Sequence, residues 1–186
     1  MKTKAAKIIK RYRVVLFCLA LGSARYVESA APVKEYGRVF AHFGEERERK
    51  GKLDESVSSY QKALRFDPTL AEAYHRLGVV YRLKGDLNKA VAFSEKAVLL
   101  APEFHQAYHD LGQAYRAQGD YASALNAFEK AWALYPILPF EKQYLYDLAI
   151  AYRDVGDLVN ALDRAKELRK KDAEGADRLM KELDPE

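Results

Sequence analysis

Apolar positions come in pairs of helical stripes separated by a short polar break. In residues 71–104 the two stripes are Tyr74, Leu77, Gly78 and Tyr81, then Leu87, Ala90, Val91 and Ser94, each spaced i, i+3, i+4, i+7. Gly85 and Asp86 stand between them, where glycine can take the positive φ that ends a helix and aspartate can cap the next one. Pro102 disfavours helix in the residue before it. The pattern predicts a helical hairpin with one apolar side.

The pattern of this hairpin recurs 34 residues later. Aligning Leu77 on Leu111 brings each feature of the first unit onto its counterpart: Tyr74, Gly78, Tyr81, Gly85, Asp86, Ala90, Ala97 and Pro102 match Tyr108, Gly112, Tyr115, Gly119, Asp120, Ala124, Ala131 and Pro136. A glycine inside a helix costs roughly 0.5–1 kcal/mol relative to alanine, so its return predicts close approach of the paired helix. A repeat of this length indicates an array of stacked units.

Four such units divide residues 37–175, at 37–70, 71–104, 105–138 and 142–175. The first unit matches the repeat pattern less well, since it has Arg47 where the later units have tyrosine. The fourth unit is preceded by three residues more than the 34-residue period. Ser94 stands where the other units have Tyr60, Phe128 and Ala165, and Phe93 is expected to compensate for the small side chain. We expect residues 25–36 to form a linker, and residues 176–186 a short amphipathic capping helix and tail.

These residues resemble the tetratricopeptide repeat. The resemblance implies an all-α fold, a right-handed α-solenoid of four helix-turn-helix hairpins with the capping helix. In that family the first helix of each hairpin lines a concave channel that binds extended or helical peptide segments. The matching positions here are Glu72, His75, Val79, Arg82, Gln106, His109, Gln113, Arg116, Gln143, Tyr146, Ile150 and Arg153.

Arginine recurs in this channel, at Arg82, Arg116 and Arg153. Guanidinium groups pair with carboxylates and stack on aromatic rings, so we expect a protein or peptide partner with acidic and aromatic or apolar residues. The alternative is that each arginine forms a solvated i,i+4 pair with the aspartate of the following turn, Asp86, Asp120 or Asp157. The clamp by which one subfamily holds chaperone tails is not reproduced, because its positions carry Ala41, Glu45 and Arg76.

Catalytic motifs are missing from the sequence: no phosphate-binding glycine loop, no Gly-x-Ser-x-Gly, no His-Glu-x-x-His and no paired cysteines. His105 and His109 have a metal-ligand spacing, and His75 matches His109 one unit earlier, but no third ligand completes a site. The sequence therefore predicts a protein that is not an enzyme and that carries no cofactor. A metal site or enzyme using His75 and His109 is the weakest alternative.

The first 24 residues read as an export signal. Six lysines and arginines without an acid precede the apolar run 14–21, and small residues suited to cleavage follow between about 22 and 31. The run is short for a membrane span, which needs about 20 apolar residues. We expect an exported, periplasmic or cell-envelope protein. Anchoring in the inner membrane by residues 14–24, and a mitochondrial leader in a eukaryotic source, stay open.

The basic character of the chain is confined to this leader. Residues 1–30 hold seven of the 31 lysines and arginines and one of the 27 acids, so the rest has 24 basic and 26 acidic groups. A nearly neutral body does not favour a nucleic-acid partner, and contact with a membrane is expected only through an uncleaved leader. We expect an adaptor that binds peptide segments of partner proteins in the assembly or maintenance of an envelope complex. A self-associating scaffold that pairs through Phe140 and Tyr144 is the alternative.

Overall fold

The computed structural model of the chain describes residues 30–135 and 141–183, with side chains described from Val33 onward. Within these ranges the ordered elements are helices, and none of the helices is long and apolar enough to cross a bilayer. The export signal at 1–24, Phe140 and most of the loop before the fourth unit lie outside the described residues, so the predictions about them stay predictions.

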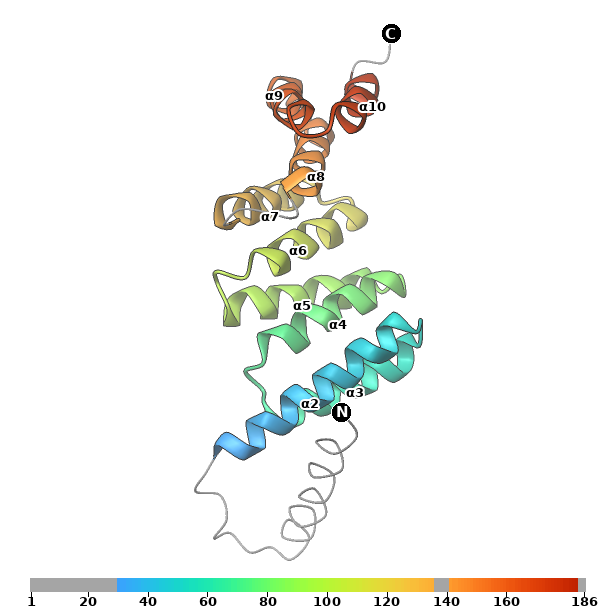
Figure 1. Cartoon of the computed structure of the whole chain (residues 1–186), viewed down its shortest axis with the longest axis vertical. Coiled ribbons are helices and arrows are strands. Elements are labelled where there is room, and N and C mark those ends of the chain that lie inside the picture. Colours follow the sequence, from blue (N-terminus) through green and yellow to red (C-terminus); the bar gives the residue numbers. More distant parts are fainter. Residues whose placement is uncertain (1–29, 136–140, 184–186) are drawn as a thin grey trace, which may run out of the picture.

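Eight helices form four antiparallel hairpins, and a ninth closes the described chain (Figure 1). The hairpins are α2 (Ala30–Arg49) with α3 (Leu53–Phe66), α4 (Ala71–Leu83) with α5 (Leu87–Leu100), α6 (His105–Gln118) with α7 (Tyr121–Leu134), and α8 (Glu141–Asp154) with α9 (Leu158–Arg169). The last helix is α10 (Ala173–Leu183). The predicted all-α stack of four hairpins and a capping helix is confirmed.

Each hairpin turns at a glycine followed, in three of the four, by a capping aspartate. Gly51, Gly85, Gly119 and Gly156 have φ values of 71°, 80°, 84° and 85°, the left-handed region that glycine enters at low cost. The side chains of Asp86, Asp120 and Asp157 accept hydrogen bonds from the backbone N–H three residues on, which satisfies a donor left unpaired at the start of each second helix. The predicted turns are therefore confirmed.

The helical glycines lie where the two helices of a hairpin approach most closely. A Cβ added at Gly44 would lie 2.5 Å from the ring of Tyr60, and one at Gly112 would lie 2.9 Å from the ring of Phe128. At Gly78 the partner is Ser94, whose Oγ would overlap the added atom. Beside it, Phe93 stacks on Tyr81 with ring centroids 5.3 Å apart, as expected from the small residue at 94.

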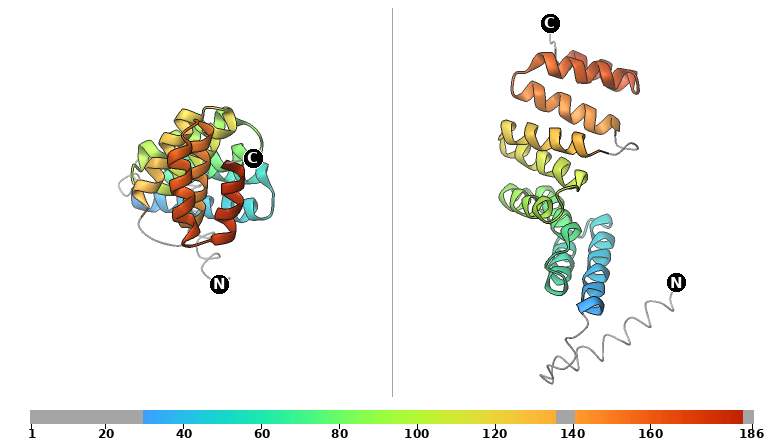
Figure 2. Two further views of the ribbon diagram at one scale, coloured as in Figure 1. Left: turned by 90° about the horizontal axis from the view of Figure 1, so that it is seen from above. Right: turned by 90° about the vertical axis from the view of Figure 1, so that its left-hand side faces the viewer.

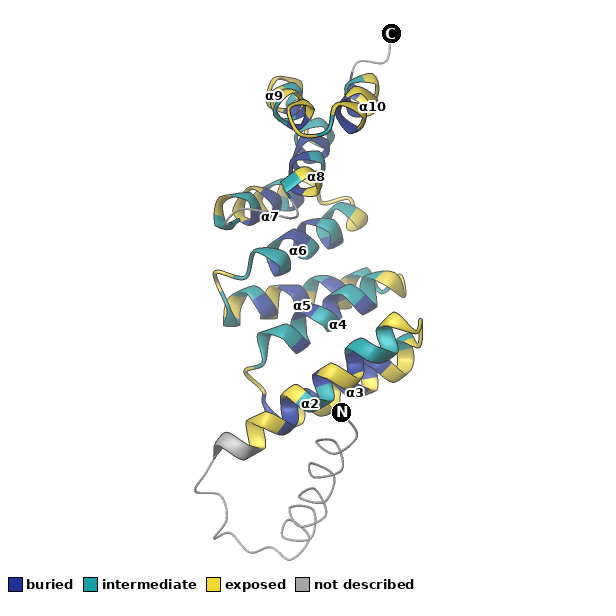
Figure 3. Ribbon diagram, viewed as in Figure 1, coloured by how far each residue is buried: buried dark blue, intermediate teal, exposed yellow. Residues whose placement is uncertain are grey.

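The core is a series of apolar clusters that pass from one hairpin to the next. Tyr60 of α3 and Leu77 of α4 share one cluster, and Phe128 of α7 and Leu148 of α8 share another. The hairpin direction rotates progressively along the array, as the two views of Figure 2 show. Buried positions follow the faces between helices in Figure 3. Each hairpin therefore buries its apolar side only by stacking on its neighbours.

The structure corrects the boundary expected at the start of the array. Residues 30–36 were predicted to lie in a linker, but α2 begins at Ala30 and is 20 residues long. Tyr36 is buried, with its ring 5.9 Å from that of Phe66 on α3, and Gly37 lies against Asp67. These contacts extend the first helix by about two turns beyond the first repeat predicted from the sequence.

The last helix also begins earlier than predicted, at Ala173 instead of residue 176. The Asp172 side chain accepts a hydrogen bond from the Gly175 N–H at 3.0 Å, so the aspartate caps the helix and Gly175 lies within its first turn. Leu179 and Leu183 are buried against Leu145, Ala165 and Leu168 of the fourth hairpin. This helix covers the C-terminal end of the described array.

Candidate functional site

The first helices α4, α6 and α8 carry the twelve side chains that the sequence assigned to a peptide channel. We call this surface the first-helix face. Nine of its twelve residues are at least partly exposed: Glu72, Val79, Arg82, Gln106, Gln113, Arg116, Gln143, Tyr146 and Arg153. The remaining three, His75, His109 and Ile150, are buried, so the prediction that their side chains face a ligand is wrong.

His75 lies between two consecutive first helices. Its Nε2 is 2.6 Å from Oδ2 of Asp110 on α6, its Nδ1 is 3.8 Å from Glu72, and its ring meets that of Phe104 edge-on at 4.9 Å. Burial acts to lower the pKa of His75, but the hydrogen bond to Asp110 and the negative charges of Asp110 and the nearby Glu72 outweigh it and raise the pKa to about 9. His75 is therefore a positively charged link between repeats at neutral pH.

His109 repeats this contact one unit further along. Its Nε2 is 2.7 Å from Oδ2 of Asp147 on α8, and its ring stacks on Tyr144 with centroids 4.4 Å apart. Tyr144 is 5% exposed, so it is not the exposed aromatic residue that the scaffold alternative required. Ile150 is buried in the apolar cluster of the fourth hairpin with Leu145. A channel position on the helix surface thus becomes an interior position once the next helix is stacked on it.

The recurring arginines also point to the next repeat. A terminal nitrogen of Arg82 lies 3.9 Å from Oδ1 of Asp110, and Nε of Arg116 donates to Asp154. These contacts join α4 to α6 and α6 to α8. The predicted alternative of i,i+4 pairs with the turn aspartates is wrong, because Asp86, Asp120 and Asp157 cap the second helices instead. The arginine ladder is an element of the stacking interface.

The same pattern continues to both ends of the face. Nε of Arg76 donates to Glu72 at 2.9 Å, and its NH1 lies 3.9 Å from Glu48 on α2. At the other end, Arg153 donates from NH2 to Asp154 at 2.9 Å and from NH1 to Glu182 on α10 at 3.2 Å. Cations and carboxylates therefore alternate along the first-helix face and largely compensate one another.

The side chains left available for a ligand are polar and lie near the middle of the face. Gln106 and Gln113 on α6 are partly exposed, and Val79 and Tyr146 provide partly exposed carbon on the neighbouring helices. Arg116 uses Nε for its pair with Asp154, and 40% of its side chain is exposed. Such a surface can donate and accept hydrogen bonds to a peptide backbone.

A metal is not supported at the histidines. His75 and His109 each bind a different aspartate, and His105 Nδ1 lies 2.9 Å from the hydroxyl of Tyr144. In residues 30–135 and 141–183 no group of three His, Cys, Asp or Glu side chains gathers in a geometry that could hold a metal ion. The histidines are explained by helix stacking.

Sequence reasoning missed the carboxylates that organise this face. Asp110 and Asp147 both directly precede the leucine that defines a repeat, and Asp154 follows Arg153 near the end of α8. The position before this leucine could have been recognised as a signal. It carries an aspartate in two successive units, and the first helix of the unit before each carries a histidine. Pairing a residue of one unit with a residue of the next was the step required.

Two clefts in the described surface lie away from the first-helix face. One, of about 740 Å³, is lined by residues of the second and third hairpin turns. The other, of about 520 Å³, lies between α5 and α7 over Tyr108, Leu111 and Tyr115 of α6. Neither of these two clefts is lined by residues of the first-helix face.

Comparison with known families bears directly on this arrangement. Models described as tetratricopeptide repeat match residues 69–137 and 109–176, and one described as TPR repeat matches residues 44–85. Together these matches run from residue 44 to residue 176, which is well over half of the chain. The chain belongs to the tetratricopeptide repeat family. Comparison with curated protein sequences gave no match.

Solved structures similar to this tetratricopeptide repeat chain include MamA, at 26% identity and a TM-score of 0.63, covering 70% of this chain and 74% of that one. PilF of Pseudomonas aeruginosa is 18% identical with a TM-score of 0.72, over 82% and 69% of the two chains. The first TPR of Spaghetti (RPAP3), bound to an HSP90 peptide, is 20% identical with a TM-score of 0.61, over 66% and 94%. The last two likenesses establish the fold alone.

Proposed function

We propose that this chain is a non-catalytic adaptor that binds a peptide segment of a partner protein on its first-helix face. Membership of the tetratricopeptide repeat family supports a role in protein–protein interaction, and one similar structure holds a peptide. The observation that carries the proposal is the set of accessible polar side chains on the first helices of three successive hairpins. Buried His75–Asp110 and His109–Asp147 contacts hold those helices in register.

The charge pattern of the face defines the segment that it fits. Because most of its arginines already contact carboxylates of the same chain, a strongly acidic segment would have to displace internal pairs. An extended segment held through its backbone by Gln106 and Gln113 requires no such displacement. A single carboxylate on that segment can pair with the outer nitrogens of Arg116. The proposed partner segment is therefore less acidic than the one expected from the recurring arginines.

Affinity capture with the full chain tests the adaptor function. We expect the chain carrying Gln106→Ala and Gln113→Ala to lose its partner, and Arg116→Glu to weaken capture, because both changes remove donors from the accessible centre of the face. Gln61→Ala, an exposed glutamine on α3, is the matched control and leaves capture unchanged. A partner retained at wild-type level by both face variants would rule out this surface as its binding site.

The cell envelope is the proposed location of the adaptor, in the assembly or maintenance of an envelope complex. The support comes from the sequence, where a basic segment without acids precedes an apolar run and small residues. Mass spectrometry of the protein from its native source is expected to find an N-terminus between residues 22 and 31. An intact Met1 on protein free of the membrane would contradict export.

A further inference from the structure

Exposed apolar side chains in the described chain gather at the turns of the hairpins. Eight large apolar side chains are exposed in these residues, and five of them lie within three residues of a turn glycine. These five are Leu83, Tyr121, Val155, Leu158 and Val159, with exposed fractions of 56%, 45%, 40%, 48% and 73%. Three of them adjoin a single turn, between α8 and α9. Exposed apolar residues scattered singly are ordinary, but a grouped set indicates an interaction surface.

The turns form one continuous edge of the array. Gln118 at the third turn donates to Asn88 at the second turn at 2.9 Å, and Lys84 pairs with Asp54 at the start of α3. The pair between Arg116 and Asp154 joins the ends of α6 and α8. We call this surface the turn edge. In Figure 1 the turns of the first three hairpins lie along the right-hand side of the array.

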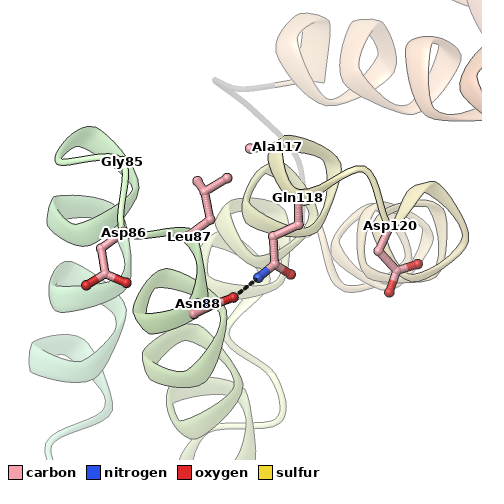
Figure 4. Close-up of a pocket in the computed structure, with 7 residues that line it drawn as sticks. All are labelled: Gly85, Asp86, Leu87, Asn88, Ala117, Gln118 and Asp120. Atoms are coloured by element: carbon pink, nitrogen blue, oxygen red, sulfur yellow. Dashed lines mark hydrogen bonds between the residues drawn. The ribbon is translucent and has the colours of Figure 1, made fainter.

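A cleft opens in the turn edge between the second and third turns. Its volume is about 740 Å³, and its lining combines Leu87 and Ala117 with the polar side chains of Asn88 and Gln118 (Figure 4). Asp86 and Asp120 line it as well. Exposed apolar side chains thus occur at three consecutive turns, with Leu83 at the second, Tyr121 at the third and Leu158 at the fourth.

The charge of this edge is negative at its C-terminal half. Each of the third and fourth turns carries an aspartate, Asp120 and Asp157, whose pKa is lowered by hydrogen bonds to the following helix, so both are ionised at neutral pH. The start of a helix contributes only about half a positive charge, which leaves each turn net negative. Neither stretch 118–123 nor stretch 155–160 contains a lysine or arginine, and Arg116 and Arg153, which precede these stretches, both pair with Asp154.

We propose that the turn edge binds an amphipathic helix of a partner protein, one with an apolar stripe flanked by lysine or arginine. Neighbouring helices pack roughly 10 Å apart, and seven residues of a helix rise about 10.5 Å, so apolar residues at i and i+7 reach two consecutive turns. The basic residues of the stripe's flanks meet Asp120 and Asp157. Apart from Arg116 at the end of α6, this surface shares no residue with the first-helix face, so the inference goes beyond the proposed function.

Selection of randomised 18-residue peptides displayed on phage, with the full chain as immobilised target, tests this assignment. We expect the enriched peptides to share an apolar i, i+3, i+4, i+7 stripe with flanking lysine or arginine. Fluorescence anisotropy should then show binding weakened by about tenfold, which is 1.4 kcal/mol, in a chain carrying Leu158→Ser and Val159→Ser. Asp120→Asn with Asp157→Asn should have a similar effect, since asparagine keeps the helix cap and removes the charge.

Two control variants distinguish binding at the turn edge from binding elsewhere on the chain. Leu99→Ser removes a side chain that is 71% exposed on α5 away from the turns, and Gln106→Ala alters the first-helix face at the end of α6 remote from its turn; neither should change the affinity of these peptides by more than about twofold. Selected peptides that bind the Leu158→Ser, Val159→Ser chain with wild-type affinity, or that carry acidic flanks, would overturn the proposal. So would dimers of the full chain in light scattering that this variant abolishes, because the occupant would then be a second copy.

Discussion

At the scale of single residues, the stack depends on polar side chains placed between apolar layers. His75 and Asp110 form a pair across two hairpins, and His109 and Asp147 repeat it across the next two. The His75–Asp110 pair is charged at neutral pH, and although a buried ion pair adds little net stability compared with apolar packing, removing one partner leaves a buried charge and is costly. Such pairs therefore fix the register of successive first helices.

The pKa of His75 predicts how stability depends on pH. Because its pKa rises from an ordinary 6.5 to about 9 on folding, its contribution is complete below pH 6.5 and is lost as the pH rises through 9. Glu72 on its own helix and Asp110 on α6 are the charged groups that set this behaviour, and Arg82 lies beside Asp110. At 1.36 kcal/mol for each pKa unit, the loss amounts to about 3 kcal/mol.

Urea unfolding at pH 6.5 and pH 9.5 measures this loss. We expect the free energy of unfolding of the wild-type chain to fall over this range by more than that of His75→Asn, which has no imidazole to titrate. His42→Asn is the control, since His42 is largely exposed on α2 and should follow the wild type. Parallel pH dependence of the wild type and His75→Asn would show that this histidine is not charged in the folded chain.

At the scale of the hairpin, close approach depends on a small residue on the first helix where the two helices meet. Glycine faces a ring in the first and third hairpins, at Gly44 with Tyr60 and at Gly112 with Phe128. In the second hairpin both partners are small, since Gly78 faces Ser94, and Phe93 fills space beside Tyr81. The same helix pair is thus achieved with different pairs of side chains, as long as their combined volume fits.

Alanine at Gly112 tests this requirement. The added Cβ would lie 2.9 Å from the ring of Phe128, which is 3% exposed and cannot move aside into solvent. We expect Gly112→Ala to lower the free energy of unfolding by about 1–2 kcal/mol, after the helix propensity of alanine offsets part of the strain. In a double-mutant cycle with Phe128→Leu, the combined loss should be smaller than the sum of the two. If the two losses of unfolding free energy simply add, the strain of Gly112→Ala does not arise from its contact with Phe128.

At the scale of the whole molecule, the two ends of the described array differ. The C-terminal end is closed by α10, whose Leu179 and Leu183 are buried against the fourth hairpin. At the N-terminal end Phe43 is 41% exposed, and Arg47 lies over its ring at 5.9 Å. Repeat arrays need a helix with a polar outer face to cover their last apolar surface.

Shortening Leu179 to alanine should loosen this closure. Leu179 is fully buried, and loss of such a leucine typically costs about 2–5 kcal/mol. In a linear array the effect should concentrate in neighbouring units, so hydrogen exchange is expected to quicken in α8, α9 and α10 more than in α4 and α5. Lys181→Ala on the exposed side of α10 is the control. Uniform loss of protection along the chain would contradict the repeat-by-repeat model.

Much of the fold followed from local signals in the sequence. Glycine and aspartate at each turn, helical spacing of apolar residues and the 34-residue period are properties of neighbouring residues, so they predicted the hairpins and their stacking. The boundaries at Ala30 and Ala173 were missed because they depend on distant or side-chain contacts, such as Tyr36 with Phe66 and Asp172 with the Gly175 N–H.

The sequence by itself determined which helices exist, where they turn and that they must stack, because each unit has an apolar side it cannot bury alone. Only the tertiary structure decided which residues of the first helices remain available to a partner. His75, His109 and Ile150 lie on the predicted channel face of an isolated helix, but the next helix in the array covers them. Burial depends on what packs against a residue, and that neighbour lies 35 to 38 residues further along the chain.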